Sequence, residues 1–203
     1  MPKRLLGLWM VLAAVALWPT VARAGLEEGR QAYRNGNYGQ AFQEFLPLAQ
    51  AGDTTMQNQI AGMYYTGQGT AQDFEKAAEW FRKAAQGGSP EGQYCLGKLY
   101  YYGQGVPQNF EEGGKWLTEA GVAGKGGAQY LLAVLYLYGK GVRKNVVKAY
   151  FWAVLAARSD DIPAGDKTDA QALRAQIEAL LSPKQVKSIQ TMAQDWTPHR
   201  KKS

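Results

Sequence analysis

The chain has 203 residues, of which 46% are hydrophobic and 20% are charged, and it contains a single histidine and a single cysteine. One histidine excludes a multi-histidine metal site and argues against a histidine-based catalytic triad. One cysteine excludes an internal disulfide. The formal net charge of +6 is modest and spread along the chain, so it does not indicate binding to nucleic acid.

Residues 1–24 have the order of a secretory signal peptide. Lys3 and Arg4 precede an apolar run over 5–21, and the segment closes on small residues that end at Ala24. We therefore expect cleavage after Ala24 and a periplasmic or secreted mature chain. An uncleaved membrane anchor is the alternative, although the run is near the lower limit of length for spanning a bilayer. No later stretch is long and apolar enough to span a membrane, so none is expected to enter one after cleavage.

A period of 36 residues organises the middle of the chain. Residues of the same type recur at this spacing in four separate series, which are Gly67, Gly103 and Gly139; Gly69, Gly105 and Gly141; Trp80, Trp116 and Trp152; and Tyr64, Tyr100 and Tyr136. So many coincidences at one period indicate an array of structural repeats.

Each period has the pattern of two helices joined by a glycine turn. Residues 54–66 carry apolar side chains at helical spacing before a Gly-x-Gly turn, and residues 74–85 carry a second apolar stripe. Asp73 is expected to cap this second helix, and Asn109 and Asn145 take the same position in the later periods. One helix pair is too small to bury its own apolar face, so the pairs must stack.

The segments 63–69 (MYYTGQG) and 72–85 (QDFEKAAEWFRKAA) closely resemble the Sel1-like repeat, a relative of the tetratricopeptide repeat found in exported bacterial proteins. A second unit matches equally well over 96–110, and a third is looser but keeps the tyrosine, Gly-x-Gly and tryptophan positions. The expected boundaries of the three Sel1-like units are about 53–87, 88–123 and 124–158.

Residues 25–52 resemble a tetratricopeptide unit, with a shorter turn between the helices. From Gly29 to Ala41 is 12 residues, whereas Ala61 to Ala77 is 16. The two resemblances imply an all-α fold, a right-handed α-solenoid of stacked antiparallel helix pairs.

The period is lost after Arg158. Helices are predicted from Lys167 to Leu181 and from Pro183 to Asp195. We expect residues 159–198 to form a helix pair that caps the open end of the solenoid, with a separate binding element as the alternative. For the basic tail over 199–203 we expect a solvated end, and contact with acidic phospholipid or cell-wall polymer is the alternative.

The sequence offers little catalytic chemistry. The adjacent carboxylates Glu111-Glu112 lie in the opening turn of a predicted helix, and Asp160-Asp161 lie in a loop. Cys95 lies between apolar residues and is expected to be a buried side chain rather than a reactive thiol. We therefore expect no catalytic residue, no metal site and no cofactor.

The resemblance implies that the first helix of each pair lines a concave face where partners bind. Tyrosine suits such a surface, because it combines a broad apolar ring with a polar tip. Tyr64, Tyr100 and Tyr136 take the packing position instead. Matching the chain to the family pattern gives the expected contact residues, which are Asn58, Tyr65, Thr66, Tyr94, Lys98, Tyr101, Tyr102, Tyr130, Val134, Leu137 and Tyr138.

Such a groove is aromatic, with Lys98 near its centre, and suits a protein or peptide ligand with apolar anchors and an acidic group. The leading hypothesis is a non-catalytic, monomeric scaffold of the cell envelope or of secreted type. An envelope glycan- or peptidoglycan-binding protein is the alternative, since tyrosine rings can stack on sugars. An envelope hydrolase is a third, which the inventory of reactive residues disfavours.

Overall fold

The structure, a computed structural model, describes residues 24–162 and 164–198. Most of the predicted signal peptide and the whole basic tail therefore lie outside the described residues. Within those residues the regular structure is helical, and no strand is present. Residues 24–34 lie in the first helix, and the others are α2 (Tyr38–Gln50), α3 (Thr54–Thr66), α4 (Phe74–Gln86), α5 (Pro90–Tyr102), α6 (Phe110–Val122), α7 (Gly126–Tyr138), α8 (Val146–Arg158), α9 (Ala164–Glu178) and α10 (Pro183–Gln194).

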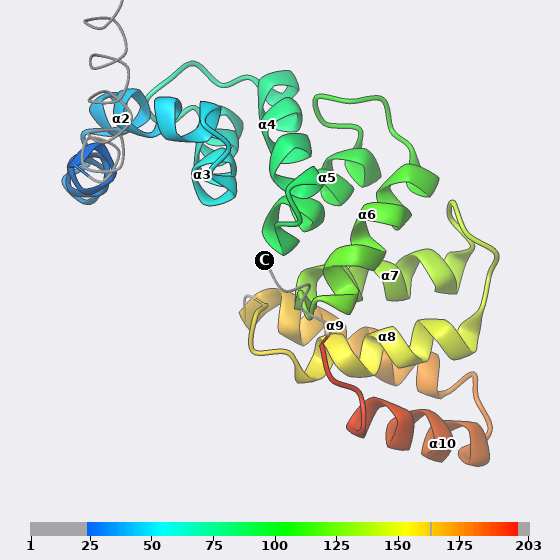
Figure 1. Cartoon of the computed structure of the whole chain (residues 1–203). Helices are drawn as coiled ribbons and strands as arrows, with labels where there is room; N and C mark the ends of the chain where they lie inside the picture. Colours follow the sequence, from blue (N-terminus) through cyan, green and yellow to red (C-terminus); the bar gives the residue numbers. More distant parts are fainter. Residues whose placement is uncertain (1–23, 163, 199–203) are drawn as a thin grey trace, which may run out of the picture.

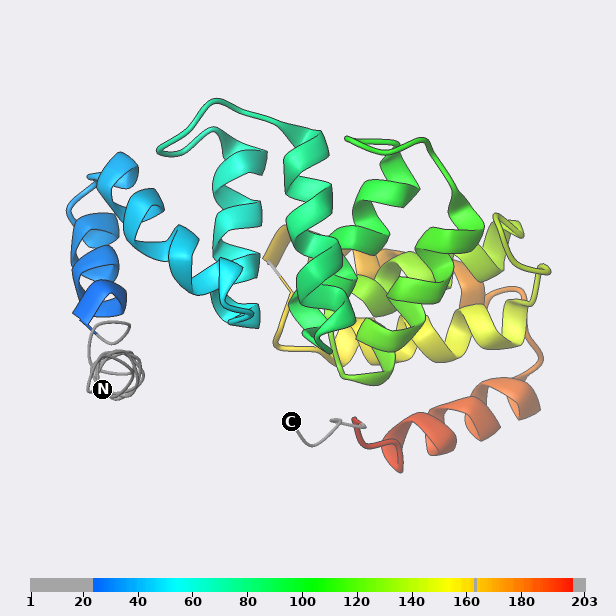
Figure 2. The same cartoon turned by 45° about the horizontal axis from the view of Figure 1, so that its top comes forward.

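Successive helices from α2 to α9 pack against one another and form a curved stack of antiparallel pairs, which is the predicted α-solenoid (Figure 1). Each pair contacts the next, and half-buried aromatic residues such as Trp80 and Trp152 pack against the buried clusters on both sides. At the C-terminal end α8 packs against both α9 and α10, and Figure 2 shows α10 alongside α8 at the far end of the stack from α2.

Side-chain caps fix where the second helices begin. Asp73, Asn109 and Asn145 are in extended conformation, and each side chain accepts a hydrogen bond of 2.9–3.0 Å from the backbone N–H three residues later. Such caps satisfy N–H groups that have no partner inside the helix. The three predicted caps are confirmed.

The two glycines of each turn have different structural roles. Gly103 ends α5 in the left-handed conformation, with φ of 70°. Gly105, with φ of 66°, lies directly against the backbone of Phe74, at the start of the second helix in the preceding pair. Gly69 and Gly141 meet Tyr38 and Phe110 in the same way. The second glycine therefore sets how closely neighbouring pairs approach.

Three glutamines form a buried polar series that the sequence reading missed. Gln57, Gln93 and Gln129 are 36 residues apart and nearly inaccessible to solvent. Each side-chain amide donates to the carbonyl eight residues earlier, at 3.1, 3.4 and 3.0 Å. Each bond ties the start of a first helix to the end of the helix before it. A buried polar side chain is tolerated when it is hydrogen-bonded, which explains glutamine in an apolar helix.

The C-terminal helices differ slightly from the predicted ones. The helix expected from Lys167 to Leu181 is α9, which begins and ends three residues earlier. The sequence pattern also predicts Leu180 on the apolar stripe of this helix, but Leu180 lies beyond its end and is exposed. The start of α10 is as predicted, with a capping box between Ser182 and Gln185.

Candidate functional site on the first-helix face

The first helices of successive pairs form a continuous surface, since α7 contacts both α5 and α9. We call the surface made by α3, α5, α7 and the first turns of α9 the first-helix face. The 36-residue period aligns the tyrosines on it in rows. These rows are Tyr65 with Tyr101, Tyr94 with Tyr130, and Tyr102 with Tyr138.

Tyr102 and Tyr138 are the most open of these side chains, at 55% and 57% exposed. Each is the last residue of its helix, directly before a left-handed glycine, Gly103 or Gly139. The chain turns away at that glycine, so no following turn of helix covers the ring. These two rings are therefore accessible to a partner without any rearrangement.

Two half-buried tyrosines combine packing with partial exposure. The hydroxyl of Tyr65 donates to Oε1 of Gln104 at 3.0 Å, and its ring meets Phe74 edge-on at 5.1 Å. Tyr101 packs in the same way against Phe110 at 5.3 Å and against Tyr102 at 4.9 Å. Tyr101 therefore supports the exposed ring of Tyr102.

Lys98 lies between the rows, with its ammonium 5.9 Å from the Tyr65 ring and 5.8 Å from the Tyr94 ring. The Tyr94 ring packs over Gly127, where a β-carbon would meet the phenol. Burial, with smaller effects from neighbouring charges such as Asp166, raises the pKa of Tyr94 to about 12.

Asn58, Thr66 and Val134 contribute the remaining polar and apolar surface. The Asn58 amide donates to Oγ of Ser89 at 2.7 Å, which joins α3 to the N-terminal cap of α5. Thr66 is exposed, and its hydroxyl donates to the carbonyl of Gly62 at 2.9 Å. Val134 is half-buried against the core between α7 and α8. A hollow of about 640 Å³ beside Asn58 extends the face toward its N-terminal end.

The prediction that Leu137 is a contact residue of the groove is wrong. The residue was expected on the groove, at the position that Tyr65 and Tyr101 hold in the earlier units. It is only 4% exposed and packs in the core with Ala149 and Tyr150 of α8. Its side chain stabilises the fold and is not available for contact with a partner.

Tyr130 of α7 contacts α9 and so connects this helix to the first-helix face. Its ring packs against Ile162 and Ala170, and α9 also carries the exposed residues Asp166 and Asp169. Burial raises the pKa of the Tyr130 phenol, and the charges of Asp169 and Asp166 raise it further. The sequence reading missed both aspartates, because α9 lies outside the 36-residue period that aligned the other positions.

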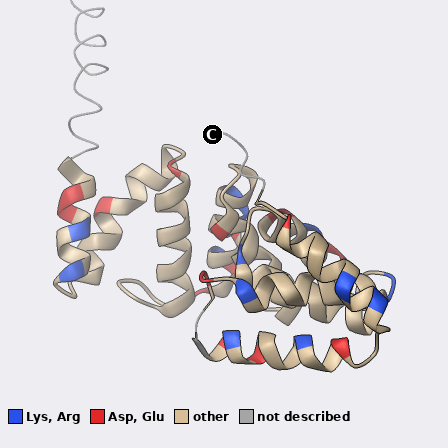
Figure 3. Ribbon diagram, turned by 90° about the horizontal axis from the view of Figure 1, so that it is seen from below, with Lys and Arg blue, Asp and Glu red and all other residues tan. Residues whose placement is uncertain are grey.

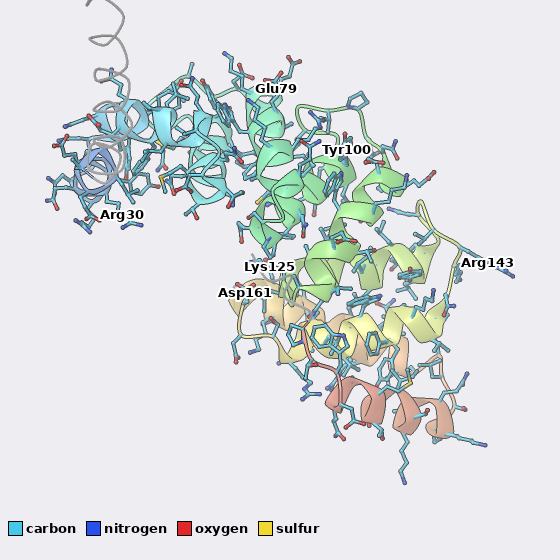
Figure 4. All side chains as sticks on the ribbon, viewed as in Figure 1. Arg30, Glu79, Tyr100, Lys125, Arg143 and Asp161 are labelled. Atoms are coloured by element: carbon cyan, nitrogen blue, oxygen red, sulfur yellow. The ribbon has the colours of Figure 1, made fainter. Side chains whose placement is uncertain are left out.

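The adjacent carboxylates take part in ion pairs. Lys115 pairs with Glu111 and Glu112 at 3.3 Å each on the surface of α6. Asp160 pairs with Lys167 at 3.2 Å. Asp161 pairs at 2.8 Å with Lys125, which lies beside it in Figure 4.

Lys125 also pairs with Glu91 at 2.6 Å, so this one ammonium links α5, the start of α7 and the loop after α8. Burial lowers its pKa, but the bonds to Asp161 and Glu91 outweigh that effect and raise it overall. Across the array basic and acidic side chains are interspersed (Figure 3).

The free cysteine, Cys95, is half-buried on α5. Burial, together with the nearby Glu91 carboxylate, raises the pKa of its thiol to about 12. In the part of the chain that the structure describes, no group of three or more potential ligands could hold a metal ion. The same residues include no helix long and apolar enough to cross a membrane.

Comparison with known proteins identifies this architecture. The Sel1 repeat family model matches residues 55–89, 90–121 and 127–161. The chain belongs to the Sel1 repeat family. Sel1 repeat proteins are generally non-catalytic scaffolds whose repeats mediate protein interactions. Among curated proteins, none matches this Sel1 chain.

Two solved structures are similar to this Sel1 repeat protein. One is a protective antigen present in uropathogenic Escherichia coli strains that displays an SLR fold, with 29% identity and a TM-score of 0.67 over 77% of this chain. This chain spans 32% of that antigen, about a third of its length. The other is a Sel1 repeat protein from Oxalobacter formigenes, with 26% identity and a TM-score of 0.68, covering 86% of this chain and 68% of that one.

Proposed function

We propose that this Sel1 repeat protein is a non-catalytic scaffold that binds a protein or peptide on its first-helix face. The observation that carries the proposal is the pair of rings of Tyr102 and Tyr138. They are more than half exposed and aligned by the repeat, and the half-buried Tyr101 packs edge-on against Tyr102. Exposed tyrosines over an apolar base are a frequent feature of protein-binding surfaces. Asn58, Tyr65, Thr66, Tyr94, Lys98 and Val134 complete the proposed contact surface.

We further propose that the protein acts in the periplasm or after secretion, as a monomer. The charge and hydropathy pattern of residues 1–24 supports export. Sel1 repeats are also common in exported bacterial proteins. The helices α9 and α10 support a monomer, because they cover the apolar side of α8 at the end of the array.

The test is a pull-down from envelope extract and culture medium with the purified chain and a Tyr102→Ala/Tyr138→Ala variant. Both rings are exposed, so the variant should keep the parent's helicity and melting temperature. A matched control is Leu180→Ala/Met192→Ala, which removes two exposed apolar side chains, 61% and 57% accessible, from the loop after α9 and from α10.

We expect a partner that the parent and the control retain and the tyrosine variant loses, since a central interface tyrosine contributes roughly 2 kcal/mol or more to binding. A partner retained equally by all three proteins would place binding elsewhere on the molecule. Capture of a polysaccharide instead of a protein would favour the glycan-binding alternative.

A further inference from the structure

The first-helix face carries uneven charge where α7 meets α9. Asp166 and Asp169 are exposed on the first turns of α9, where the neighbouring Ala170 packs against Tyr130. The charges of both carboxylates also raise the pKa of the Tyr130 phenol. Neither aspartate forms an ion pair among the described residues. Free carboxylates therefore border the tyrosine rows at this end.

The lysines around these aspartates already have partners. Lys125 lies between Glu91 and Asp161, and Lys167 pairs with Asp160. Lys98 lies farther along the face, against the rings of Tyr65 and Tyr94. The surface between α7 and α9 therefore has a local excess of negative charge beside aromatic rings.

Aromatic rings with adjacent carboxylates are complementary to a cationic side chain. A guanidinium or ammonium group is attracted to the face of a tyrosine ring and pairs with carboxylate oxygens. The ring of Tyr102 meets that of Tyr101 edge-on at 4.9 Å, and Tyr138 holds the same position as Tyr102 one repeat later, on the helix that carries Tyr130. The acidic ligand group expected from Lys98 alone does not suit this end of the surface.

We infer that the partner of the first-helix face is a peptide segment with a lysine or arginine flanked by apolar residues, whose cationic group lies against Tyr102, Tyr130 and Tyr138 and pairs with Asp166 and Asp169. The inference rests on the proposed function and specifies the chemistry of the ligand. The apolar flanks lie on the tyrosine rows, and the cation sets the position of the segment along them.

The experiment is selection of random dodecapeptides, displayed on phage, against the purified chain, followed by fluorescence anisotropy with the selected peptides. Lysine or arginine should be enriched at one position of the selected sequences. Asp166→Asn/Asp169→Asn should weaken their binding about fivefold, because exposed charge pairs contribute modestly and remain screened by salt.

The matched control is Glu75→Gln/Asp195→Asn, which removes two exposed carboxylates from α4 and from the end of α10. It should leave binding unchanged. A charge-reversed variant, Asp166→Lys/Asp169→Lys, should select peptides enriched in glutamate or aspartate instead. Circular dichroism of every variant verifies that the fold is retained.

Selected peptides without enrichment of basic residues would overturn the inference, as would equal binding by the parent and the Asp166→Asn/Asp169→Asn variant. Failure to select any peptide would overturn it as well. The proposed function is judged separately, by the pull-down with the Tyr102→Ala/Tyr138→Ala variant, so a neutral or acidic ligand lost by that variant would contradict the inference alone.

Discussion

The hydroxyl of Tyr150 donates a 2.7 Å hydrogen bond to Oε2 of Glu178, and it accepts a second bond of 3.1 Å from the Gln190 amide. Tyr150 is fully buried on α8, whereas its partners belong to α9 and α10. One phenol oxygen therefore holds both C-terminal helices on the last Sel1 pair.

Replacing this residue by Tyr150→Phe should destabilise the protein by about 1–2 kcal/mol, because two hydrogen bonds are lost and the oxygen of Glu178 keeps no partner there. The apolar packing of the ring stays the same. Thermal unfolding followed by circular dichroism should show a decrease of roughly 3–6 °C for a chain of this size. The control is Tyr138→Phe, in which an exposed hydroxyl is removed. Equal melting temperatures for the two variants would show that the Tyr150 bonds do not stabilise the C-terminal pair.

Stability should fall as the pH rises above about 9, and Cys95 should account for the first part of the decrease. Its thiol has a pKa of about 12 in the folded chain against 9.0 ordinarily, and Tyr94 has about 12 against 10.0. The unfolded chain therefore releases protons that the folded chain retains. Stability from these groups is complete below pH 9 and is lost as the pH rises toward 12.

Urea unfolding at intervals from pH 8 to pH 10 measures this dependence. Cys95→Ala should flatten the curve between pH 9 and pH 10, before the tyrosines of the unfolded chain ionise extensively. The quantity to compare is the slope of the free energy of unfolding against pH, because the substitution also alters packing and so shifts the absolute values. Parallel curves for the parent and the variant would mean that burial does not hold the thiol in its protonated form.

Gly105→Ala should be among the most damaging small substitutions in the chain. The residue has a positive φ of 66°, and its β-carbon would meet the carbonyl group of Phe74 in the neighbouring pair. The left-handed conformation alone costs about 1–2 kcal/mol for alanine, and the backbone contact adds to it because the two pairs must separate. We expect a total loss of about 3 kcal/mol or more in chemical denaturation.

The matched control for the glycine is Gly36→Ala. Gly36 also has a positive φ, of 79°, but its β-carbon would have open space around it. Gly36→Ala should lower the free energy of unfolding by only about 1 kcal/mol, which is the cost of the left-handed backbone conformation by itself. Similar losses for the two variants would mean that repeat spacing tolerates an additional methyl group at Gly105.

The repeating part of the fold was predictable because each unit contains its own signals. The caps at Asp73 and Asn109 and the turn glycines recur at one spacing, so three copies identify positions that a single copy would not. Gln129 shows the limit, since its burial depends on a carbonyl at the end of α6 that only the folded array places beside it.

The tyrosine rows of the candidate site could be predicted from the sequence, whereas the residues that α9 contributes at its C-terminal end could not. Tyr102 and Tyr138 follow from the repeat, and their exposure follows from the glycine after each. Leu137 was misplaced because the last repeat is covered by further helices, which turns a surface position into core. Asp166 and Asp169 belong to α9, where no period indicates which side chains face the tyrosines.

Removal of residues 159–203 should expose the apolar side of α8 and promote self-association. Tyr150 is fully buried and Val154 is 5% exposed, and both lie in a core shared with Leu173 and Ile177 of α9. A contiguous apolar surface of this kind promotes association, as do uncapped ends of repeat arrays. Size-exclusion chromatography with light scattering should show oligomers or aggregates, together with a lower melting temperature.

A point variant separates loss of the cap from loss of chain length. Ile177→Asp places a charge at a fully buried position of α9 while the sequence stays complete. An unpaired buried charge is strongly unfavourable, so α9 should detach and reproduce the behaviour of the truncated chain. If both proteins remained monomeric and melted at the parent's temperature, α9 and α10 would not be a cap, and a binding role for this helix pair would become the better explanation.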